Sequence, residues 1–457
     1  MSAPEAFVRH VLRQDWGAIP APARAAAQAF LLDTLAVGIA GRRAWLADKV
    51  LDVARSWGSA DAQTPGAHVF GGGPHLPAPS AAFVNGFQIH CQEYDCVHEP
   101  AVVHPMAVIG AALMAEAEAR PVSGADFLAA LTGAVDVAAG LGVAALSPIR
   151  FFRPATAGLF GATLGIARLR GASLDQALDA LGYALAQAAG TMQAHVEGKP
   201  ALPLQIAGAA RAALVANDLA AAGIPGPHDV FEGPYGYLSL FEERSDLAPV
   251  IASLGRTFRI AEVSYKPFPT GRAAQGGIVL MQRLRDSGVR ARDIAAVRLI
   301  APPLIERLVG RPARADMQVN YTRLCFAYCG ALALREGHVR LDGFTPGALT
   351  NRDTLALAAR IEVVSDGTDN PAAFAPQTLE ARLVSGETRT LTLDALYGSP
   401  ADPMRGADIA AKRAECLAFG LIAPQSCLDA SLQEAVGALP RATSTATLTA
   451  LMSGRTA

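Results

Sequence analysis

The side chains best suited to chemistry gather in one stretch, His90 to Pro105, which reads HCQEYDCVHEPAVVHP. Pro100 and Pro105 interrupt any helix here, so the stretch is predicted to be an ordered loop between two helices. Imidazole and carboxyl groups held between apolar helices suit a site that moves protons. The loop supplies three histidines and three carboxylates: His90, His98, His104, Glu93, Asp95 and Glu99.

Two alternatives to proton transfer remain open for this loop. Thiol, imidazole and carboxylate groups are metal ligands, but Cys91 and Cys96 lack the C-x-x-C spacing and no second pair nearby completes a zinc site. An iron–sulfur cluster needs more thiolates than this neighbourhood supplies. The other alternative is a solvated turn in which Asp95 and His98 serve only as caps. We expect no metal in this protein.

Basic side chains that could hold a carboxylate occur at two turns. The segment 264–272, SYKPFPTGR, carries Lys266 and Arg272 near its ends, and two prolines and a glycine fix its backbone. Arg272 also opens a predicted helix, where backbone N–H groups favour anions, so this turn is predicted to clamp a carboxylate or phosphate. Lys199 stands between a glycine and a proline before another helix; a ligand contact and an exposed loop lysine are equal alternatives there.

A tyrosine on a later helix is the remaining candidate. Tyr321, Cys325 and Tyr328 are spaced four and three residues apart and fall near one helix face. A buried tyrosine with a hydrogen-bonded hydroxyl is the simpler interpretation unless this face lines the cleft.

The elements that must position these groups are of two kinds. Residues 1 to about 255 consist of Ala-rich runs with helical spacing, and the part from 403 is helical again. Between them, short alternating runs predict strands at 258–264, 295–301 and 360–364 and a hairpin of 379–384 with 388–393. We therefore predict a mainly α protein, with a large all-helical bundle domain (1–255 plus 403–457) and a smaller α+β lid domain (256–402).

Composition narrows the class of protein. Of the 457 residues 51% are hydrophobic and 18% charged, which predicts a well-buried globular chain and excludes disorder. The formal net charge of −2 offers no basic field for nucleic acid. The first residues carry no apolar run of signal-peptide length, and Asp136 interrupts the apolar segment 127–146, so we expect a cytoplasmic protein without a membrane span.

Taken together and in this order, the motifs resemble the MmgE/PrpD family, which includes 2-methylcitrate dehydratase, cis-aconitate decarboxylase and iminodisuccinate epimerase. The resemblance covers most of the chain. The segments that carry it are LLDTLAVGIAG (31–41), AAFVNGFQIH (81–90), EYDCVHEPAVVHP (93–105), RPATAGLFGA (153–162), AAAGIPGP (220–227) and YKPFPTGR (265–272).

The resemblance implies a helical domain with a smaller α+β lid, usually a homodimer with the site between domains, and cofactor-free chemistry on small polycarboxylates. The family's acidic motif corresponds to Glu93-Tyr94-Asp95-Cys96, and its His-Pro corresponds to His104-Pro105. Two positions depart from the family pattern. Cys96 replaces an acidic residue, and Phe152 or Arg153 stands where many members carry a histidine.

Carried over to these positions, the resemblance implies roles for single residues. Lys199, Lys266 and Arg272 would bind substrate carboxylates and stabilise the charge of the ionised carbon acid. Asp95 or His104 would exchange the carbon-bound proton, and His98 or Tyr328 would protonate a leaving hydroxyl. The predicted catalytic residues are Asp95, His104, Lys199, Lys266, Tyr328 and His98, and the predicted substrate-binding residues are Glu93, Arg153 and Arg272.

The leading hypothesis from sequence is a cofactor-free dehydratase, a hydro-lyase acting on a small hydroxy-polycarboxylate such as 2-methylcitrate. An isomerase, an epimerase or a decarboxylase of a di- or tricarboxylate shares the same proton step and stays open, and the absent family histidine favours this second reading. A catalytically silent binding protein on the same fold is the alternative of another class, since a fold does not guarantee an activity.

Overall fold

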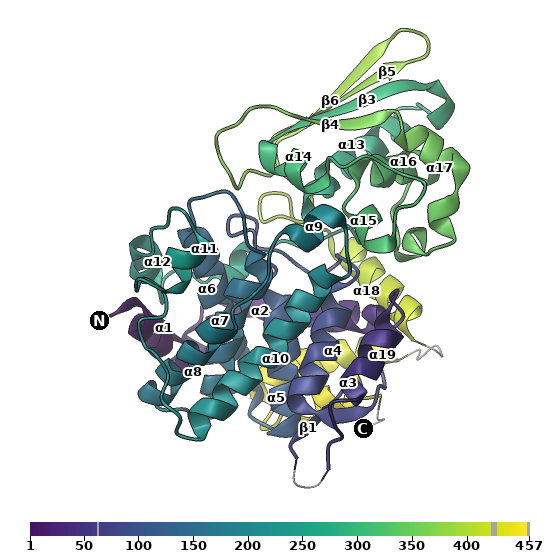
Figure 1. The fold of residues 1–457 in the computed structure, drawn as a ribbon. Coiled ribbons are helices and arrows are strands. Elements are labelled where there is room, and N and C mark those ends of the chain that lie inside the picture. Colours follow the sequence, from purple (N-terminus) through teal and green to yellow (C-terminus); the bar gives the residue numbers. More distant parts are fainter. Residues whose placement is uncertain (62–63, 422–426, 455–457) are drawn as a thin grey trace.

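The computed structural model describes residues 1–61, 64–421 and 427–454. Figure 1 shows a lower stack of helices and, above it, a smaller part that combines a sheet with helices. The lower part begins with α1 (Ala3–Leu12), α2 (Ala21–Gly41), α3 (Ala47–Arg55), a two-stranded hairpin of β1 (Gly66–His68) and β2 (His75–Pro77), α4 (Ala78–His90), α5 (Pro105–Ala119) and α6 (Gly124–Ala144). It continues with α7 (Arg153–Leu169), α8 (Leu174–Gln187), α9 (Gln193–Glu197), α10 (Ala201–Ala221), α11 (Tyr237–Phe241) and α12 (Ala248–Ser253).

Small residues set the spacing of the central helices. Helices α4, α5, α6, α7 and α10 pack on one another, and their buried faces are largely alanine and glycine. Gly161 of α7 lies so close to α6 that an added Cβ would stand 2.4 Å from the carbonyl oxygen of Ala134. This close packing gives the rigid base on which the loop after α4 is built.

The C-terminal helices return to this stack. They are α18 (Gly406–Gly420), α19 (Leu428–Ala438) and α20 (Ala446–Met452). Helices α18 and α19 pack against α2, and α20 packs against α5. Residues near the end of the chain therefore lie beside residues near its beginning (Figure 1).

The smaller part is built on a four-stranded sheet of order β4-β3-β5-β6. Strand β3 (Ile294–Ala301) is parallel to β4 (Ile361–Ser365) and antiparallel to β5 (Gln377–Leu383), which forms a hairpin with β6 (Thr388–Leu393). Its helices are α13 (Arg272–Asp286), α14 (Pro303–Val309), α15 (Val319–Arg323), α16 (Phe326–Glu336) and α17 (Arg352–Ala358). The mainly α character and the sheet-bearing second part agree with the expectation from sequence.

The predicted strand over 258–264 is wrong. Residues 259–262 form a short 3-10 helix, η2 (Arg259–Glu262), that packs against α2 and α6 of the helical part. Buried Asp136 on α6 accepts a hydrogen bond from the backbone N–H of Arg259 at 2.7 Å, which holds the segment to the helices. Only Ser264 pairs in the manner of a strand, through a bridge to Val97.

Within the part of the chain that the structure describes, two helices, α2 and α6, are long and apolar enough to cross a membrane by length and composition. The apolar window of α6 is 94% buried inside the protein, and Asp136 within this helix contacts His10 at 2.9 Å. Such coverage by neighbouring helices is typical of core helices.

A glycine pair tests how tightly the helices pack. Gly161→Ala should destabilise the protein by about 1–3 kcal/mol, because the new methyl group must push α7 away from α6. Gly208→Ala on α10 is the control: its added Cβ meets nothing within 4 Å, so a helix-interior alanine should stabilise by about 0.5–1 kcal/mol. Urea unfolding of both variants measures the difference, and equal midpoints would contradict the close approach.

Candidate active site

The loop that the sequence singled out connects two helices of the core. Helix α4 ends at His90, and His104 is the residue that precedes α5. Within the loop, Glu93 and Val102 adopt left-handed backbone conformations with φ of 51° and 52°. Such conformations are costly for residues other than glycine and persist where surrounding contacts enforce them, often at functional sites.

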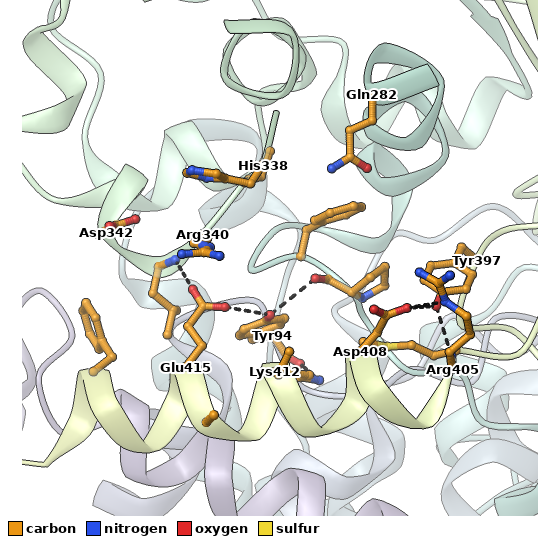
Figure 2. A pocket seen from close by; sticks show the side chains of 18 of the residues that line it. Tyr94, Gln282, His338, Arg340, Asp342, Tyr397, Arg405, Asp408, Lys412 and Glu415 are labelled. Atoms are coloured by element: carbon orange, nitrogen blue, oxygen red, sulfur yellow. Dashed lines mark hydrogen bonds and ion pairs between the residues drawn. The ribbon is translucent and has the colours of Figure 1, made fainter. Parts of the chain in front are cut away.

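A lysine from the C-terminal part braces the loop from one side. The buried ammonium of Lys412 on α18 lies 2.8 Å from Asp33 and donates to the carbonyl oxygen of Tyr94 at 2.9 Å. The Tyr94 hydroxyl donates to Pro267 and to Glu415, each at 3.3 Å, as Figure 2 shows. These contacts hold the backbone on either side of Tyr94, between the two acidic residues.

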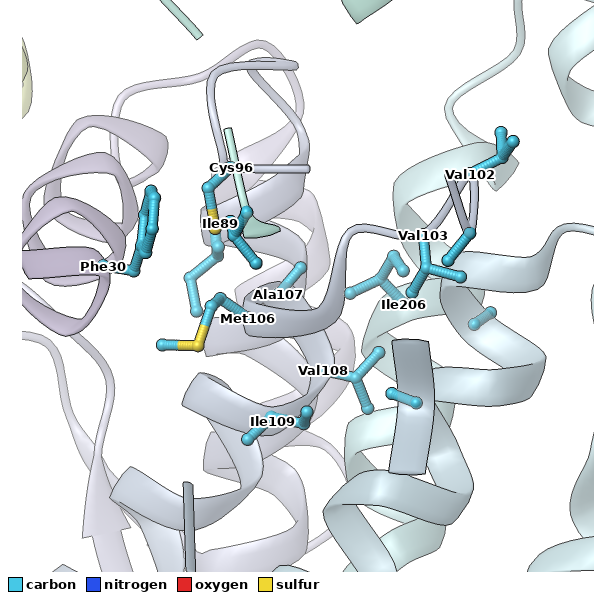
Figure 3. Packing of buried hydrophobic residues seen from close by; sticks show 14 of the residues in the cluster. Phe30, Ile89, Cys96, Val102, Val103, Met106, Ala107, Val108, Ile109 and Ile206 are labelled. Carbon is cyan, nitrogen blue, oxygen red and sulfur yellow. The ribbon is translucent and has the colours of Figure 1, made fainter. Parts of the chain in front are cut away.

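The hydrophobic core anchors the other end of the loop. Cys96, Val102 and Val103 belong to the same buried hydrophobic cluster as Phe30 and Ile89, part of which Figure 3 shows. Burial raises the pKa of the Cys96 thiol well above its ordinary value, so the thiol stays neutral. The residue that replaces an acid of the family motif is therefore a core side chain in this protein.

The bridge between Val97 and Ser264 brings a second buried lysine to the loop. Both backbone hydrogen bonds of the bridge are made, at 3.0 and 2.7 Å, two residues before Lys266. The Lys266 ammonium donates to the Glu93 carboxylate at 3.0 Å and to the Glu93 carbonyl at 3.1 Å, and it lies 3.9 Å from Asp95. The lysine side chain has no exposed surface.

Two histidines share the Asp95 carboxylate. His90 Nδ1 lies 3.0 Å and His104 Nδ1 lies 3.1 Å from the same oxygen, and the two rings meet edge to face. Asp95 is completely buried. We define the acid–base cluster as His90, Glu93, Asp95, His104 and Lys266.

The positive neighbours keep both carboxylates of the cluster ionised. Burial by itself raises the pKa of Asp95, but the charges of His90 and Lys266 and the hydrogen bond from His104 outweigh it and hold this pKa well below the ordinary value. Burial likewise opposes ionisation of Glu93, yet Lys266, followed by His90, lowers its pKa to about 2. A buried carboxylate that stays charged needs such partners.

The pKa values of the two histidines are shifted in opposite directions. Burial lowers the pKa of both, but for His90 the attraction of Asp95 and Glu93 prevails, so its pKa is raised and it is the proton-carrying partner. For His104 burial and the repulsion of Lys266 prevail, so its pKa is lowered and the ring is neutral near pH 7. Groups with divergent pKa values are a common basis for acid–base chemistry.

The cluster opens onto a small cavity of about 50 Å³ between the helical part and the smaller part. Its polar lining consists of Glu93, His104, His195 and Arg272. Most of the other lining residues are apolar, and they come from both parts: Val97, Val102, Ile149, Phe152, Pro154, Met192, Leu202, Gly271, Ala273, Leu308, Val309, Leu324 and Phe374.

Five predicted site residues therefore lie together: Glu93, Asp95, His104, Lys266 and Arg272. Arg272 lines the cavity, but its guanidinium already binds Glu99 at 2.8 Å and backbone carbonyls including that of Tyr397 at 2.9 Å. Its N–H groups are engaged inside the protein, so in this structure Arg272 fixes the cavity wall.

Two predicted residues are buried in other contacts. His98 Nε2 lies 2.8 Å from Glu262, and its Nδ1 accepts from the N–H of Ala101, so it stabilises the turn inside the loop. Arg153 pairs with Glu242 at 2.8 Å and donates to the carbonyl of Ser147. Neither residue lines the cavity, which corrects the expectation that they face the substrate.

Lys199 and Tyr328 also lie outside the cavity. Lys199 is exposed between α9 and α10, which matches the alternative of a solvated loop lysine. The Tyr328 hydroxyl donates to the carbonyls of Gly343 and Ala348, at 3.0 and 3.3 Å, and Tyr328 does not line the cavity. The expectation that both side chains converge on the cleft is wrong. The Lys199 ammonium remains in solvent, and hydrogen bonds to two backbone carbonyls hold the Tyr328 hydroxyl away from the cavity.

Sequence reasoning missed His195 on α9. This side chain is nearly buried, lines the cavity, and lies 3.1 Å from Arg311 through Nδ1. Burial and Arg311 lower its pKa to about 3. The chain around it, QAHVEGK, drew attention only through Lys199, because nothing in the local sequence shows that the His195 side chain is buried at the cavity while Lys199 is exposed.

Among residues 1–61, 64–421 and 427–454, two groups of side chains are close enough to be considered for a metal ion. His90, Asp95 and His104 offer ligand atoms within 4.8 Å of one another, but the carboxylate oxygens already meet imidazole nitrogens and an ammonium ion, which disfavours a further cation. The second group, His68, His75 and Glu118, is near the β1–β2 hairpin and does not line the cavity.

A helical domain is joined to a smaller α+β part, and a buried cluster of carboxylates, imidazoles and an ammonium group lies at a cavity lined by both. Residues 5–250 match the MmgE/PrpD N-terminal domain and residues 268–430 match the MmgE/PrpD C-terminal domain. The chain therefore belongs to the MmgE/PrpD family, whose members such as cis-aconitate decarboxylase are lyases.

The relatives found by sequence similarity are named as decarboxylases. A cis-aconitate decarboxylase-like protein of Aspergillus oryzae is 28% identical over 400 residues, which cover 81% of each chain. Cis-aconitate decarboxylase of Homo sapiens is 26% identical over 404 residues, covering 84% of this chain and 81% of the human protein. The Mus musculus enzyme is also 26% identical, with 83% and 79% covered.

The charge state of Glu93 predicts a pH dependence of stability. The unfolded chain takes up a proton near the ordinary pKa of 4.5, whereas the folded chain does so only near 2. The stabilisation by Glu93 is therefore complete above about pH 4.5 and is lost as the pH falls toward 2. Glu93→Gln should cost roughly 3–5 kcal/mol at pH 7, because Lys266 loses a buried partner, and the cost should shrink in acid.

Urea unfolding at pH 7, 5 and 3 measures this dependence. Exposed Glu197→Gln is the matched control and should change stability by less than about 0.5 kcal/mol at each pH. A loss from Glu93→Gln that is the same at pH 7 and pH 3 would contradict the lowered pKa.

Proposed function

We propose that this protein is a lyase that acts on small polycarboxylates by exchanging a proton at the carbon next to a carboxylate. The observation that carries the proposal is the state of His104. Ionised Asp95 can only accept a hydrogen bond, so His104 Nδ1 carries the proton and Nε2 keeps its lone pair. A neutral imidazole of this tautomer on a cavity wall is a general base.

The surroundings support an anionic substrate. Within the cluster, the carboxylates of Glu93 and Asp95 lie against the Lys266 ammonium and the His90 ring, whose raised pKa favours its protonated form, so these neighbours reduce the negative field that a substrate carboxylate meets. The first residues of the 15-residue helix α13 also line the cavity, and backbone N–H groups at a helix N-terminus favour anions. Both features stabilise the charge that forms when a carbon acid ionises.

The cavity is too small to admit a polycarboxylate in the arrangement that the structure shows. A volume of about 50 Å³ holds only a few water molecules at roughly 10–15 Å³ each. Since the walls come from both parts of the chain, a polycarboxylate enters when these parts separate. The reaction then takes place where the apolar wall excludes water.

Among the lyase reactions, we propose decarboxylation of an unsaturated polycarboxylate of the cis-aconitate kind. One C–C bond to a carboxylate breaks, carbon dioxide leaves, and the electron pair forms a new C=C bond. The former double bond supplies the pair that takes a proton at the carbon beside the remaining carboxylate. This proton comes from water by way of Nε2 of His104, which takes it up and passes it to the carbon. The names of the relatives and the largely apolar wall, which favours loss of a charged carboxylate as neutral carbon dioxide, support this choice.

Dehydration of a hydroxy-polycarboxylate is the second candidate. The neutral state of His104 favours it, because dehydration begins by removing a proton from carbon. It ranks second because His98 and Tyr328, the two predicted acids for the leaving hydroxyl, are engaged elsewhere. An acid for that step would have to come from the cavity lining.

Proton NMR in D₂O tests the proposal. The purified protein is incubated with cis-aconitate, citrate, 2-methylcitrate and simpler dicarboxylates. Deuterium incorporation beside a carboxylate is the expected sign of proton exchange at carbon. Release of carbon dioxide identifies decarboxylation, and loss of hydroxyl identifies dehydration. A folded protein that leaves every acid unchanged would contradict the proposal.

His104→Gln should lower kcat at least about 100-fold, because the proton carrier is lost while the polar side chain keeps the volume. In the wild type, kcat/KM should change with pH below pH 6.5, where the lowered pKa of His104 places its titration: it falls with rising pH if His104 delivers the proton and rises if His104 removes it. Exposed His228→Gln is the control and should keep full activity. An active His104→Gln variant would remove His104 from this role.

A further inference from the structure

The cavity is lined by a second imidazole, that of His195, whose two ring nitrogens have the opposite hydrogen-bonding roles to those of His104. His195 is nearly buried on α9 and lines the same cavity. Its Nδ1 lies 3.1 Å from a guanidinium nitrogen of Arg311. Because a guanidinium can only donate, Nδ1 accepts and the proton of the neutral ring is on Nε2.

Several contacts fix Arg311 in place behind His195. The guanidinium stacks on the ring of Tyr321 at 5.0 Å, and the Tyr321 hydroxyl donates to the carbonyl of Pro312 at 2.7 Å. The carbonyl of Arg311 accepts from the Cys325 thiol at 3.2 Å. The pair thus joins α9 of the helical part to the segment after α14 across the cavity.

Burial and the neighbouring charges keep the His195 ring neutral. Burial lowers its pKa most, Arg311 and Arg307 lower it further, and Glu93 is the opposing negative charge. Among the described residues, none accepts a hydrogen bond from Nε2. The N–H group at Nε2 is therefore free for a ligand in the cavity.

We propose that His195 is a second catalytic residue: a neutral imidazole whose Nε2–H donates to a substrate carboxylate as negative charge develops on it, with Arg311 as its positioning residue. The inference rests on the proposed function. His104 offers a lone pair at Nε2 and His195 offers a proton at Nε2, so one ring exchanges the proton at carbon while the other stabilises the resulting anion. In this role the neutral His195 ring donates a hydrogen bond to the anion without transferring its proton.

The tautomer can be tested without turnover. In ¹⁵N-histidine-labelled protein, the His195 signals are identified by their loss in His195→Gln. Nδ1 should have the shift of an unprotonated nitrogen and Nε2 that of an N–H, unchanged between pH 5 and 8. In Arg311→Met, His195 should titrate nearer pH 6.5, whereas Arg311→Lys should retain the wild-type pattern. Titration of wild-type His195 near pH 6.5, or a proton on Nδ1, would overturn the proposal.

Kinetics with an acid that the protein turns over tests the catalytic role. His195→Leu should lower kcat about 100-fold or more with KM changed less than about threefold, the effect of losing one donor to a developing anion. His195→Gln retains an N–H near the position of Nε2 and should recover at least a tenth of the activity. A fully active His195→Leu would overturn the role. A wild type inert toward every acid would instead refute the proposed function, while the spectra would still decide the tautomer.

Discussion

The burial of one ammonium group, that of Lys266, is the constraint on which the site depends. Taking a charge out of water costs several kcal/mol, and only close carboxylates and hydrogen bonds compensate for it. Lys266 finds them in Glu93 and Asp95, and in return it keeps both acids ionised. The strained backbone at Glu93 follows from the same requirement, because the lysine binds both its carboxylate and its carbonyl.

The remainder of the fold keeps this cluster in place. Lys412 on α18 holds the loop from the opposite side through Asp33 and the carbonyl of Tyr94, so two buried lysines enclose the acidic segment. The alanine and glycine faces of the central helices allow close packing beneath it, and Cys96 fastens the loop into that core. Rigid packing of this kind is what allows a catalytic group to be held in one geometry.

The two departures from the family motif acquire physical meaning in the structure. Cys96 lies in the core, where a carboxylate would be costly, so its identity reflects packing. Phe152 lines the cavity and packs against the ring of His90, and it makes that wall apolar. The cavity nevertheless contains a second imidazole, that of His195, which reaches it from a different helix. Family membership alone therefore does not define the chemistry of this cavity.

Sequence by itself determined the mainly α fold, most helices, the hairpin of β5 and β6, and the loop and turn that meet in the cluster. These follow from local periodicity and from motifs whose residues are near neighbours in the chain. Only the tertiary structure decided that Lys199 and Tyr328 lie outside the cavity, that residues 259–262 form a 3-10 helix where a strand was predicted, and that His195 lines the cavity. The physical reason is that side-chain direction and charge state depend on partners distant in sequence, such as Arg311 for His195 and Lys266 for Glu93.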